Sequence, residues 1–442
     1  MGTIILVITA IIEAALGLYC IITKSRQKRV RSWVRIGEFA VFVLFVLASV
    51  IQWGFRWYLP AAVLLIPAIA GGVSLIRRKE DKKEFKTVRT VLKAVVLWLV
   101  VVVAVTPALI FPQYKLPTVT GGHKVDTVVY TYTDDSRTET FGKTGGNRKV
   151  TVGFWYPEAA GGRYPLVVFS PGAFGIRASN TSTFTELASN GYVVCSIDHP
   201  YHSFFTVDTD GKFTAADPAF LQEIVDVNNG VYDDETKYKL EQKWLKLRTD
   251  DINFVLDTII GKTAENGSGE IYQLIDPAGI GLMGHSLGGA AGAKLGRDRK
   301  DVDAVISLDA GLLGEEIGFA DGKPVINRDI YPVPFLSIYT DTMKKLMDKI
   351  TDPEIVLPEK LIPATAPDAY EVYIAGTNHM SLTDLPLVSP FLVNMINGSI
   401  KKMDGAQEAD KYYVIEKMNS IVLEFFNCYL KGMGSFHSSG TY

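Results

Sequence analysis

Four long apolar stretches near the start constrain this chain more than any other feature of its sequence. They cover residues 4–22, 36–55, 57–76 and 90–111. Each is close to the ~20 residues with which a helix crosses the ~30 Å hydrocarbon core of a bilayer. The first stretch lacks a basic start and a small-residue cleavage site, so we expect it to be retained rather than removed as a signal peptide. The sequence therefore predicts an all-α membrane domain of four transmembrane helices in residues 1–111.

The basic residues predict how these helices are oriented. Residues 24–35 contain six Lys/Arg and residues 77–89 contain seven, whereas the link between the second and third stretches contains only Arg56. Lys and Arg collect on the cytoplasmic side of a membrane. Both basic segments are therefore expected inside the cell. With four spans, both termini then face outward, which predicts a multi-pass protein of the plasma membrane with an extracellular C-terminal domain.

Glu13 is the unusual residue of the first apolar stretch. An ionised carboxylate in the middle of a membrane costs ~2.5 kcal/mol or more. We therefore expect Glu13 to be protonated, paired within the bundle or functional, and a polar contact between helices is the simplest of these interpretations.

Charge is distributed unevenly between the two parts of the chain. Residues 1–111 hold 15 Lys/Arg against 5 Asp/Glu, which leaves 30 against 43 for residues 112–442. An acidic domain repels phosphate backbones, so nucleic acid is not an expected partner. The three cysteines, Cys20, Cys195 and Cys428, are too few for a disulfide framework or a cysteine metal site.

Residues 112–442 show the pattern of an α/β domain. Short β-rich runs alternate with helical segments, and turn residues separate them. Such alternation is typical of a mostly parallel sheet that is covered by helices on both faces, with ligands beyond the carboxyl ends of its strands. The expected strands are residues 150–156, 165–170, 192–198, 280–284, 304–309, 335–340 and 370–375, and the expected helices are residues 181–190, 237–260 and 289–300.

A Gly-x-Ser-x-Gly motif carries the first candidate site residue. Gly284-His285-Ser286-Leu287-Gly288 follows a predicted strand and precedes a run of small residues. This strand–turn–helix context is the one in which such a motif presents a nucleophilic serine. The glycines leave room for a strained serine backbone, and the following helix offers free N–H groups to developing negative charge. The motif therefore predicts that Ser286 is a nucleophile.

A serine nucleophile needs a histidine base that is oriented by a carboxylate. In this fold class the partners follow the serine in the order acid, then histidine, which excludes three of the six histidines. His285 adjoins Ser286 on the turn, where its side chain is expected to point away, and His437 lies in a Ser/Gly-rich tail. His379, directly after the last predicted strand, is the expected base.

Two aspartates compete for the role of the acid. Asp309 ends the strand at 304–309, and Asp341 follows the next strand, where hydrolases of this class more often keep the acid. Topology alone slightly favours Asp341 and leaves both candidates open.

Several motifs resemble the platelet-activating-factor acetylhydrolase family, which are serine-dependent lipases of the α/β-hydrolase fold. FSPG at 169–172 stands for the family's Phe-Ser-His-Gly, and Asp198-His199 closes a strand. GHSLGGA at 284–290, SLDAG at 307–311 and NHMSLTD at 378–384 complete the resemblance. Dienelactone-hydrolase-like esterases share much of this pattern. The resemblance implies an α/β-hydrolase fold and the cleavage of short or oxidised acyl chains from phospholipids.

The resemblance also assigns roles to individual residues. It places the acid in the Leu-Asp-Ala segment, so Asp309 takes this role and Asp341 becomes the alternative. The histidine carries over to His379. The two oxyanion donors of the family correspond to the backbone N–H groups of Ala173 and Leu287.

The other motifs predict little chemistry. His199-Pro-Tyr-His202 lacks a third metal ligand, and the segment from Asp208 to Gly211 lacks the closing glutamate of a calcium loop, so no metal and no organic cofactor are expected. Insertions at 203–236 and 343–367 are either lids over the site or ordinary loops.

Together these patterns predict a membrane-anchored serine esterase that cleaves lipid-like carboxylic esters through an acyl-enzyme on Ser286. Its expected partners are the membrane and a small-molecule or lipid ester. Two alternatives from other classes stay open: an acyltransferase that uses the same three residues, and a catalytically silent membrane receptor or scaffold.

Overall fold

The chain divides into two compact units in the computed structural model, which describes residues 2–77, 85–142, 145–158, 161–265, 269–350, 355–366, 368–398 and 408–442. The first unit, here called the helical unit, comprises Met1–Lys115 and Leu387–Lys402. The second, here called the sheet unit, comprises Leu116–Pro386 and Met403–Tyr442. Most of the basic segment predicted at 77–89 and part of the insertion predicted at 343–367 lie outside the described residues.

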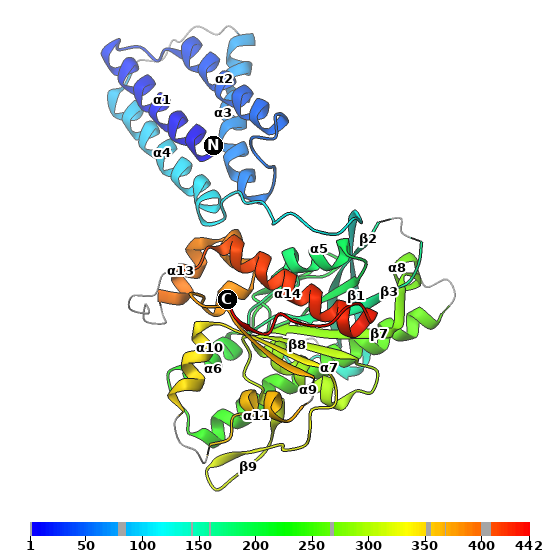
Figure 1. Ribbon diagram of the computed structural model, residues 1–442. Coiled ribbons are helices and arrows are strands. Elements are labelled where there is room, and N and C mark those ends of the chain that lie inside the picture. Colours follow the sequence, from blue (N-terminus) through cyan, green and yellow to red (C-terminus); the bar gives the residue numbers. More distant parts are fainter. Residues whose placement is uncertain are drawn as a thin grey trace. The chain divides into compact units, whose positions relative to one another are not determined.

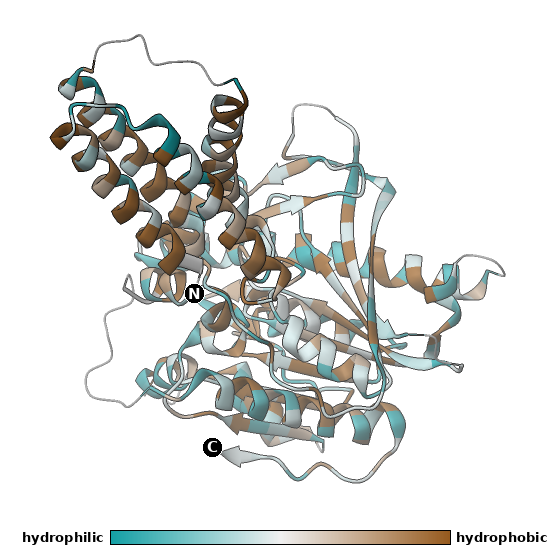
Figure 2. Ribbon diagram, turned by 90° about the horizontal axis from the view of Figure 1, so that it is seen from above, coloured by the Kyte–Doolittle hydropathy of each residue, from teal (hydrophilic) through white to brown (hydrophobic). Residues whose placement is uncertain are grey.

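The helical unit contains a bundle of four helices that lie side by side (Figure 1). The residues along these helices are largely hydrophobic (Figure 2). Among the described residues, three helical segments are long and apolar enough to cross a membrane, namely Ile4–Ile22, Phe55–Ile76 and Thr87–Ile110, which indicates membrane association. The helices are α1 (Gly2–Ile22), α2 (Lys28–Leu47), α3 (Tyr58–Ile76) and α4 (Thr87–Ile110), and α13 (Pro390–Gly398) joins them through a hydrogen bond from Ser389 Oγ to the carbonyl oxygen of Ile110 (2.6 Å).

The second predicted span needs correction. We expected it at residues 36–55, but α2 runs from Lys28 to Leu47 and takes in basic residues that the sequence had placed in a loop. The helix ends early because Ser49 adopts a left-handed backbone with φ 57°. Only residues 36–47 are mainly apolar, and Glu38 interrupts them, so α2 is shorter in apolar length than the ~20 residues of a membrane span. The structure therefore supports three of the four predicted spans by length and composition.

Glu13 is paired inside the bundle. Its carboxylate accepts hydrogen bonds from Arg35 Nε (2.5 Å) and Nη2 (3.1 Å) and from Arg31 Nη2 (3.3 Å). The Glu13 side chain is only 7% exposed, whereas the two arginines are 21% and 24% exposed. Of the three interpretations given to Glu13, the structure shows the ion pair between helices.

The sheet unit is built on a nine-stranded sheet with the order β1-β2-β4-β3-β7-β8-β11-β12-β13 (Figure 1). The pairs β1–β2 and β2–β4 are antiparallel, and the other pairs are parallel. The strands are β1 (Val125–Thr138), β2 (Asn147–Pro157), β3 (Tyr164–Ser170), β4 (Val193–Asp198), β7 (Ile275–His285), β8 (Ala304–Leu308), β11 (Phe335–Tyr339), β12 (Ala369–Tyr373) and β13 (Gly440–Thr441). The sheet is therefore mostly parallel, as the sequence predicted.

Helices cover both faces of this sheet, as the alternation of side chains along its strands requires. Leu166 and Val168 of β3 pack in a core with α7 and α9, whereas Val167 and Phe169 pack in a second core with α5 and α14. All four are at most 1% exposed, so β3 is buried on both faces and reads as a continuous apolar run. The helices are α5 (Thr181–Ser189), α7 (Asp234–Ala264), α8 (Glu270–Gln273), α9 (Leu287–Asp298) and α14 (Lys411–Lys431).

The insertions predicted at 203–236 and 343–367 contain regular structure. The first forms a two-stranded hairpin and a helix, and the second contains two helices within its described part. Another hairpin lies between β8 and β11. The elements are β5 (Phe205–Val207), β6 (Phe213–Ala215), α6 (Pro218–Asn228), β9 (Glu316–Ala320), β10 (Lys323–Ile326), α10 (Asp341–Lys349), α11 (Pro358–Thr365), α12 (Leu385–Val388) and the 3₁₀ turns η1 (Phe55–Trp57), η2 (Leu313–Glu315) and η3 (His379–Leu382).

The turn from β7 into α9 forces three backbones together. A Cβ atom on Gly288 would lie 2.0 Å from the carbonyl oxygen of Ser170 at the end of β3. A Cβ atom on Gly284 would lie 2.3 Å from the carbonyl carbon of Gly288. Real Cβ atoms do not come so near to backbone atoms, so only glycine allows α9 to begin directly against the ends of β3 and β7.

Gly288→Ala should therefore destabilise the sheet unit by about 3 kcal/mol, since overpacking against backbone is relieved only by moving a strand or a helix. The matched control is Gly292→Ala, one turn later on α9, where the nearest atom to an added Cβ is Leu282 Cβ at 3.8 Å. The control should be neutral or stabilising by up to ~1 kcal/mol because alanine favours the helix. Urea unfolding of the detergent-solubilised protein measures both, and equal effects of the two variants would contradict this account.

Candidate active site

Ser286 lies on a strained turn at the carboxyl end of β7. Its backbone has φ 53° and ψ −127°, a combination that a residue with a side chain rarely adopts. A hydrogen bond from Ser286 N to the carbonyl oxygen of Leu308 (2.9 Å) fixes the turn against the end of β8. The side chain is half-buried, and backbone strain of this kind is typical of functional sites.

Asp309 and His379 meet beside this turn. Asp309 follows β8 directly, and its Oδ2 lies 2.7 Å from Nδ1 of His379, which begins η3 after β12. The backbone N–H and the hydroxyl group of Thr340 also donate to the Asp309 carboxylate, at 2.7 Å and 2.8 Å. Asp309 is 1% exposed, whereas the His379 side chain is 30% exposed. The acid is thus enclosed while the imidazole reaches solvent.

Electrostatics define the protonation of this pair. Burial by itself would raise the pKa of Asp309, but hydrogen bonds from His379 and Thr340 favour the charged form and lower the pKa overall. An ionised carboxylate only accepts hydrogen bonds, so Nδ1 of His379 carries a proton and donates it to Asp309. In the uncharged form of this ring, Nε2 then carries no proton and can accept one. This is the tautomer that a general base requires.

Asp341, the alternative acid, does not contact the imidazole of His379 in the hydrogen bonds of the described residues. It begins α10 after β11, and its Oδ1 accepts from Tyr373 Oη (2.8 Å) and from Gly376 N (3.0 Å). The Asp341 carboxylate therefore anchors the loop that leads from β12 to His379. The structure brings Asp309, rather than Asp341, to the imidazole.

His285 lies against His379, although the sequence suggested that its side chain would point away. The two ring centroids are 4.5 Å apart, and Nε2 of His285 lies 2.9 Å from the carbonyl oxygen of His379. Burial and the neighbouring His379 lower the pKa of His285 to about 3, so the ring is neutral and donates its Nε2 proton to that carbonyl. His285 thus holds the backbone of His379 in place.

The predicted oxyanion donors border the same turn. Leu287 is the first residue of α9, and Ala173 follows Gly172, whose Cβ position lies 3.0 Å from Ser286 Cβ. Among the hydrogen bonds between described residues, neither Ala173 N nor Leu287 N has an acceptor. Leu287 also packs against Ala173 and Phe174 in one apolar cluster. Two free N–H groups therefore border Ser286 on neighbouring segments.

The Ser286 hydroxyl makes no hydrogen bond with any residue that the structure describes. Its contact with Nε2 of His379 is thus not formed here. A nucleophilic oxygen, an oriented imidazole and two free N–H groups are the parts that acyl transfer requires. Within the described residues, no group of three or more His, Cys, Asp or Glu side chains could hold a metal ion.

Sequence reasoning missed two contributors to the site. Thr340 was not considered because its neighbour Asp341 was the candidate acid. A Thr directly after a strand often caps the helix that follows, as Thr340 does for α10. Arg248 lies in the middle of α7 and is completely buried, which no periodic pattern of charged residues on a long helix reveals.

This chain is similar to several proteins of known structure or known activity. A ferulic acid esterase from Streptomyces cinnamoneus matches with a TM-score of 0.55 and 19% identity, over 72% of this chain and 94% of that one, which supports the fold alone. A platelet-activating factor acetylhydrolase from Canis lupus familiaris is 24% identical over 287 residues, which cover 62% of this chain and 59% of the canine protein. A probable 1-alkyl-2-acetylglycerophosphocholine esterase from Arthroderma benhamiae is 28% identical over 160 residues, 35% of this chain and 33% of the fungal protein.

The chain thus spans about three fifths of the length of the canine relative. A family model described as platelet-activating factor acetylhydrolase, isoform II, matches residues 149–437, which include every candidate site residue. The family resemblance inferred from the motifs is confirmed. Since this match covers more than half of the sequence, the chain belongs to the platelet-activating factor acetylhydrolase, isoform II, family.

Proposed function

We propose that this protein is a membrane-anchored serine hydrolase that cleaves carboxylic esters of lipid-like molecules. The observation that carries the proposal is the 2.7 Å contact between Asp309 and His379 beside the strained turn of Ser286. A buried carboxylate that orients a partly exposed imidazole next to such a serine is the arrangement of serine esterases.

In the proposed reaction, Ser286 Oγ attacks the acyl carbonyl while Nε2 of His379 takes the hydroxyl proton. Asp309 stabilises the imidazolium that forms, and the N–H groups of Ala173 and Leu287 bind the oxyanion. His379 then returns the proton to the leaving alcohol, which departs and leaves an acyl group on Ser286. Water attacks this acyl-enzyme by the same route and releases the carboxylic acid. The chemistry needs neither a metal nor an organic cofactor.

Apolar surface beside the site supports a lipid-like substrate. The segment that follows Gly172 pairs with the start of the first insertion, since Phe174 N donates to His202 O (2.9 Å) and Phe204 N donates to Phe174 O (3.0 Å). The hairpin that follows exposes three phenylalanines: Phe204 at 68%, Phe205 at 37% and Phe213 at 63%. Exposed aromatic side chains next to the oxyanion segment are suited to an acyl chain or a lipid surface. The names of the canine and fungal relatives also refer to lipid esters.

The proposal includes a four-span anchor in the plasma membrane with the sheet unit outside the cell, in which α2, whose apolar part is too short for a span by itself, crosses as part of the bundle. Although α2 carries Arg31 and Arg35, Glu13 of α1 neutralises part of this charge within the bundle. Paired charges that face a bundle interior are tolerated in a membrane, and long arginine side chains reach toward its surface. Four spans place both basic segments on the cytoplasmic side, as the distribution of Lys and Arg requires.

Replacing Ser286 by Ala should lower the turnover of p-nitrophenyl esters by on the order of 10⁶-fold, because the three residues act as a unit. A fluorophosphonate probe should label the wild type and fail to label Ser286→Ala. Absence of labelling in the folded wild type would favour a silent scaffold. Product analysis with and without an alcohol acceptor separates hydrolysis from acyl transfer.

Asp309→Asn should reduce kcat by about 10⁴-fold, since an amide no longer holds the required imidazole tautomer. Asp341→Asn should change kcat by less than about 10-fold, because its carbonyl oxygen can still accept from Tyr373 and Gly376. Both variants are compared by steady-state kinetics on one ester. A larger loss in Asp341→Asn would reverse the assignment of the acid.

A fluorophosphonate probe that does not cross membranes should label Ser286 on intact cells, since the proposed orientation exposes the site to the outside. Permeabilising the cells should add little further labelling of the wild type, and Ser286→Ala serves as the blank. Labelling that requires permeabilisation would place the sheet unit in the cytoplasm and contradict the four-span topology.

A further inference from the structure

Arg248, in the middle of α7, holds the segment that carries one of the proposed oxyanion donors. Its side chain is 0% exposed. Its hydrogen bonds to other described residues all go to backbone carbonyl oxygens. Nη1 donates to Pro171 O (2.9 Å), and Nη2 donates to Gly172 O (3.2 Å) and to His202 O (3.4 Å). The guanidinium group thus joins the segment after β3 to the segment after β4.

The geometry of the peptide group transmits this contact to Ala173. The carbonyl of Gly172 and the N–H of Ala173 belong to one planar peptide unit, in which they point in opposite directions. The Gly172 oxygen accepts from Gly175 N (3.0 Å) and from Arg248 Nη2 (3.2 Å), and these donors together fix the direction of the Ala173 N–H as well. The positive charge also polarises the peptide, which makes its N–H a stronger donor to an anion.

Within the described residues, the guanidinium group of Arg248 forms no ion pair. The carboxylate one turn later on α7, Asp251, forms its ion pairs within the described chain with Arg148 Nε (2.6 Å) and Arg137 Nη2 (3.0 Å) instead. Burial lowers the pKa of Arg248 to about 9, which leaves the guanidinium charged at neutral pH. The guanidinium group donates to carbonyl groups, and the nearby charge of Asp251 favours its charged form. A buried cation of this kind can also act on charge that develops beyond those carbonyl groups.

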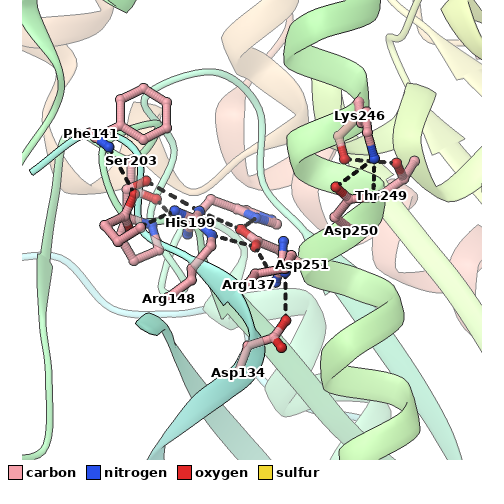
Figure 3. Close-up of polar contacts among 12 residues, drawn as sticks. Asp134, Arg137, Phe141, Arg148, His199, Ser203, Lys246, Thr249, Asp250 and Asp251 are labelled. Atoms are coloured by element: carbon pink, nitrogen blue, oxygen red, sulfur yellow. Dashed lines mark hydrogen bonds and ion pairs between the residues drawn. The ribbon is translucent and has the colours of Figure 1, made fainter. Parts of the chain in front are cut away.

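A second chain of hydrogen bonds fixes the start of the same segment. Burial and the charge of Arg248 lower the pKa of His199 to about 3, so its ring is neutral. Its Nδ1 donates to Asp251 (2.9 Å), which leaves Nε2 to accept from the Ser170 hydroxyl (3.0 Å). Figure 3 shows Asp251 facing His199 and Arg148, whereas Lys246 and Asp250 of the same helix form a separate group. The carboxyl end of β3 is thus held from the side of α7.

We propose that Arg248 is a positioning residue for the oxyanion hole: it orients and polarises the Gly172–Ala173 peptide so that the Ala173 N–H stabilises the negative charge formed on the substrate carbonyl. The inference rests on the proposed function, because it concerns the donor that serves Ser286. Arg248 itself touches neither the substrate nor Ser286.

The test compares Arg248→Gln and Arg248→Lys with Lys246→Met in the full-length, detergent-solubilised protein. Lys246 lies on the same helix, and its side chain is 75% exposed. Active sites are titrated with a fluorophosphonate so that kcat refers to folded enzyme. Arg248→Gln should lose on the order of 10²-fold in kcat, as expected for the loss of one oxyanion donor, with KM changed by less than about 3-fold. Arg248→Lys, which keeps the charge but not the two-pronged contact, should lose roughly 10-fold.

A transition-state analogue separates positioning from a structural role. Inhibition by an alkyl boronic acid, which forms a tetrahedral adduct on the serine, should weaken in Arg248→Gln by the same factor as kcat/KM. Lys246→Met should match the wild type in both measurements. If titrated Arg248→Gln keeps kcat and boronate affinity within about 3-fold of the wild type, the inference fails.

The remaining outcomes are also decisive. Where Arg248→Gln does not fold, Arg248→Lys provides the answer, since it retains size and charge, and unchanged kinetics in that variant overturn the inference. Activity that survives in Ser286→Ala would instead refute the proposed function, whatever the Arg248 variants show.

Discussion

The contact between backbones at the start of α9 is the constraint on which the candidate site depends. Gly288 touches the end of β3, and Gly284 touches α9, so that three elements converge within van der Waals distance. This convergence places Ser286 beside Gly172 of one segment and beside Leu308 of another. Asp309 follows β8 and Ala173 lies just beyond β3, so two strand ends that meet at this turn carry candidate site residues, whereas His379 comes from the loop after β12. The strain at Ser286 is the cost of that arrangement.

The contact between Asp309 and His379 is the feature that chain topology predicted poorly, because topology alone slightly favoured Asp341. β8 and β11 are adjacent parallel strands, and an aspartate follows each of them, so the order of elements could not separate the two. What distinguishes them is local. Asp309 adopts a positive φ of 48° and accepts from both donors of Thr340, whereas the Asp341 carboxylate is occupied by Tyr373 and Gly376. The family motif around Asp309 carried this information, although the general rule for the fold did not.

The buried parallel strands could be predicted from sequence because both of their faces are apolar, which leaves a short continuous run. The edge strand β1 could not, since its residues from Val125 to Thr138 are largely exposed and polar. The helix α14 was overlooked although its buried residues, among them Val414, Met418, Ile421 and Phe425, recur at helical spacing. The second span was misplaced because hydropathy marks apolar segments, and the helix α2 begins in a basic one. Sequence patterns thus locate buried strands, and they give little signal for a polar edge strand such as β1 or for the basic start of an otherwise apolar helix such as α2.

Buried arginines show why the rest of the site lay beyond sequence reasoning. The chain buries such charges in two ways: Arg148 is neutralised by Asp251 and Glu139, whereas Arg248 is solvated by backbone carbonyl groups. The first costs desolvation and gains an ion pair, so a structural role accounts for it. The second leaves the guanidinium with carbonyl partners and without a direct contact to Asp251, whose charge acts on it through space, and burying a charge that is not directly paired lowers stability. The carbonyl groups concerned lie beside Ser286, so the buried charge of Arg248 lowers the stability of the fold at the place where, in the proposed reaction, it helps to stabilise a negative charge.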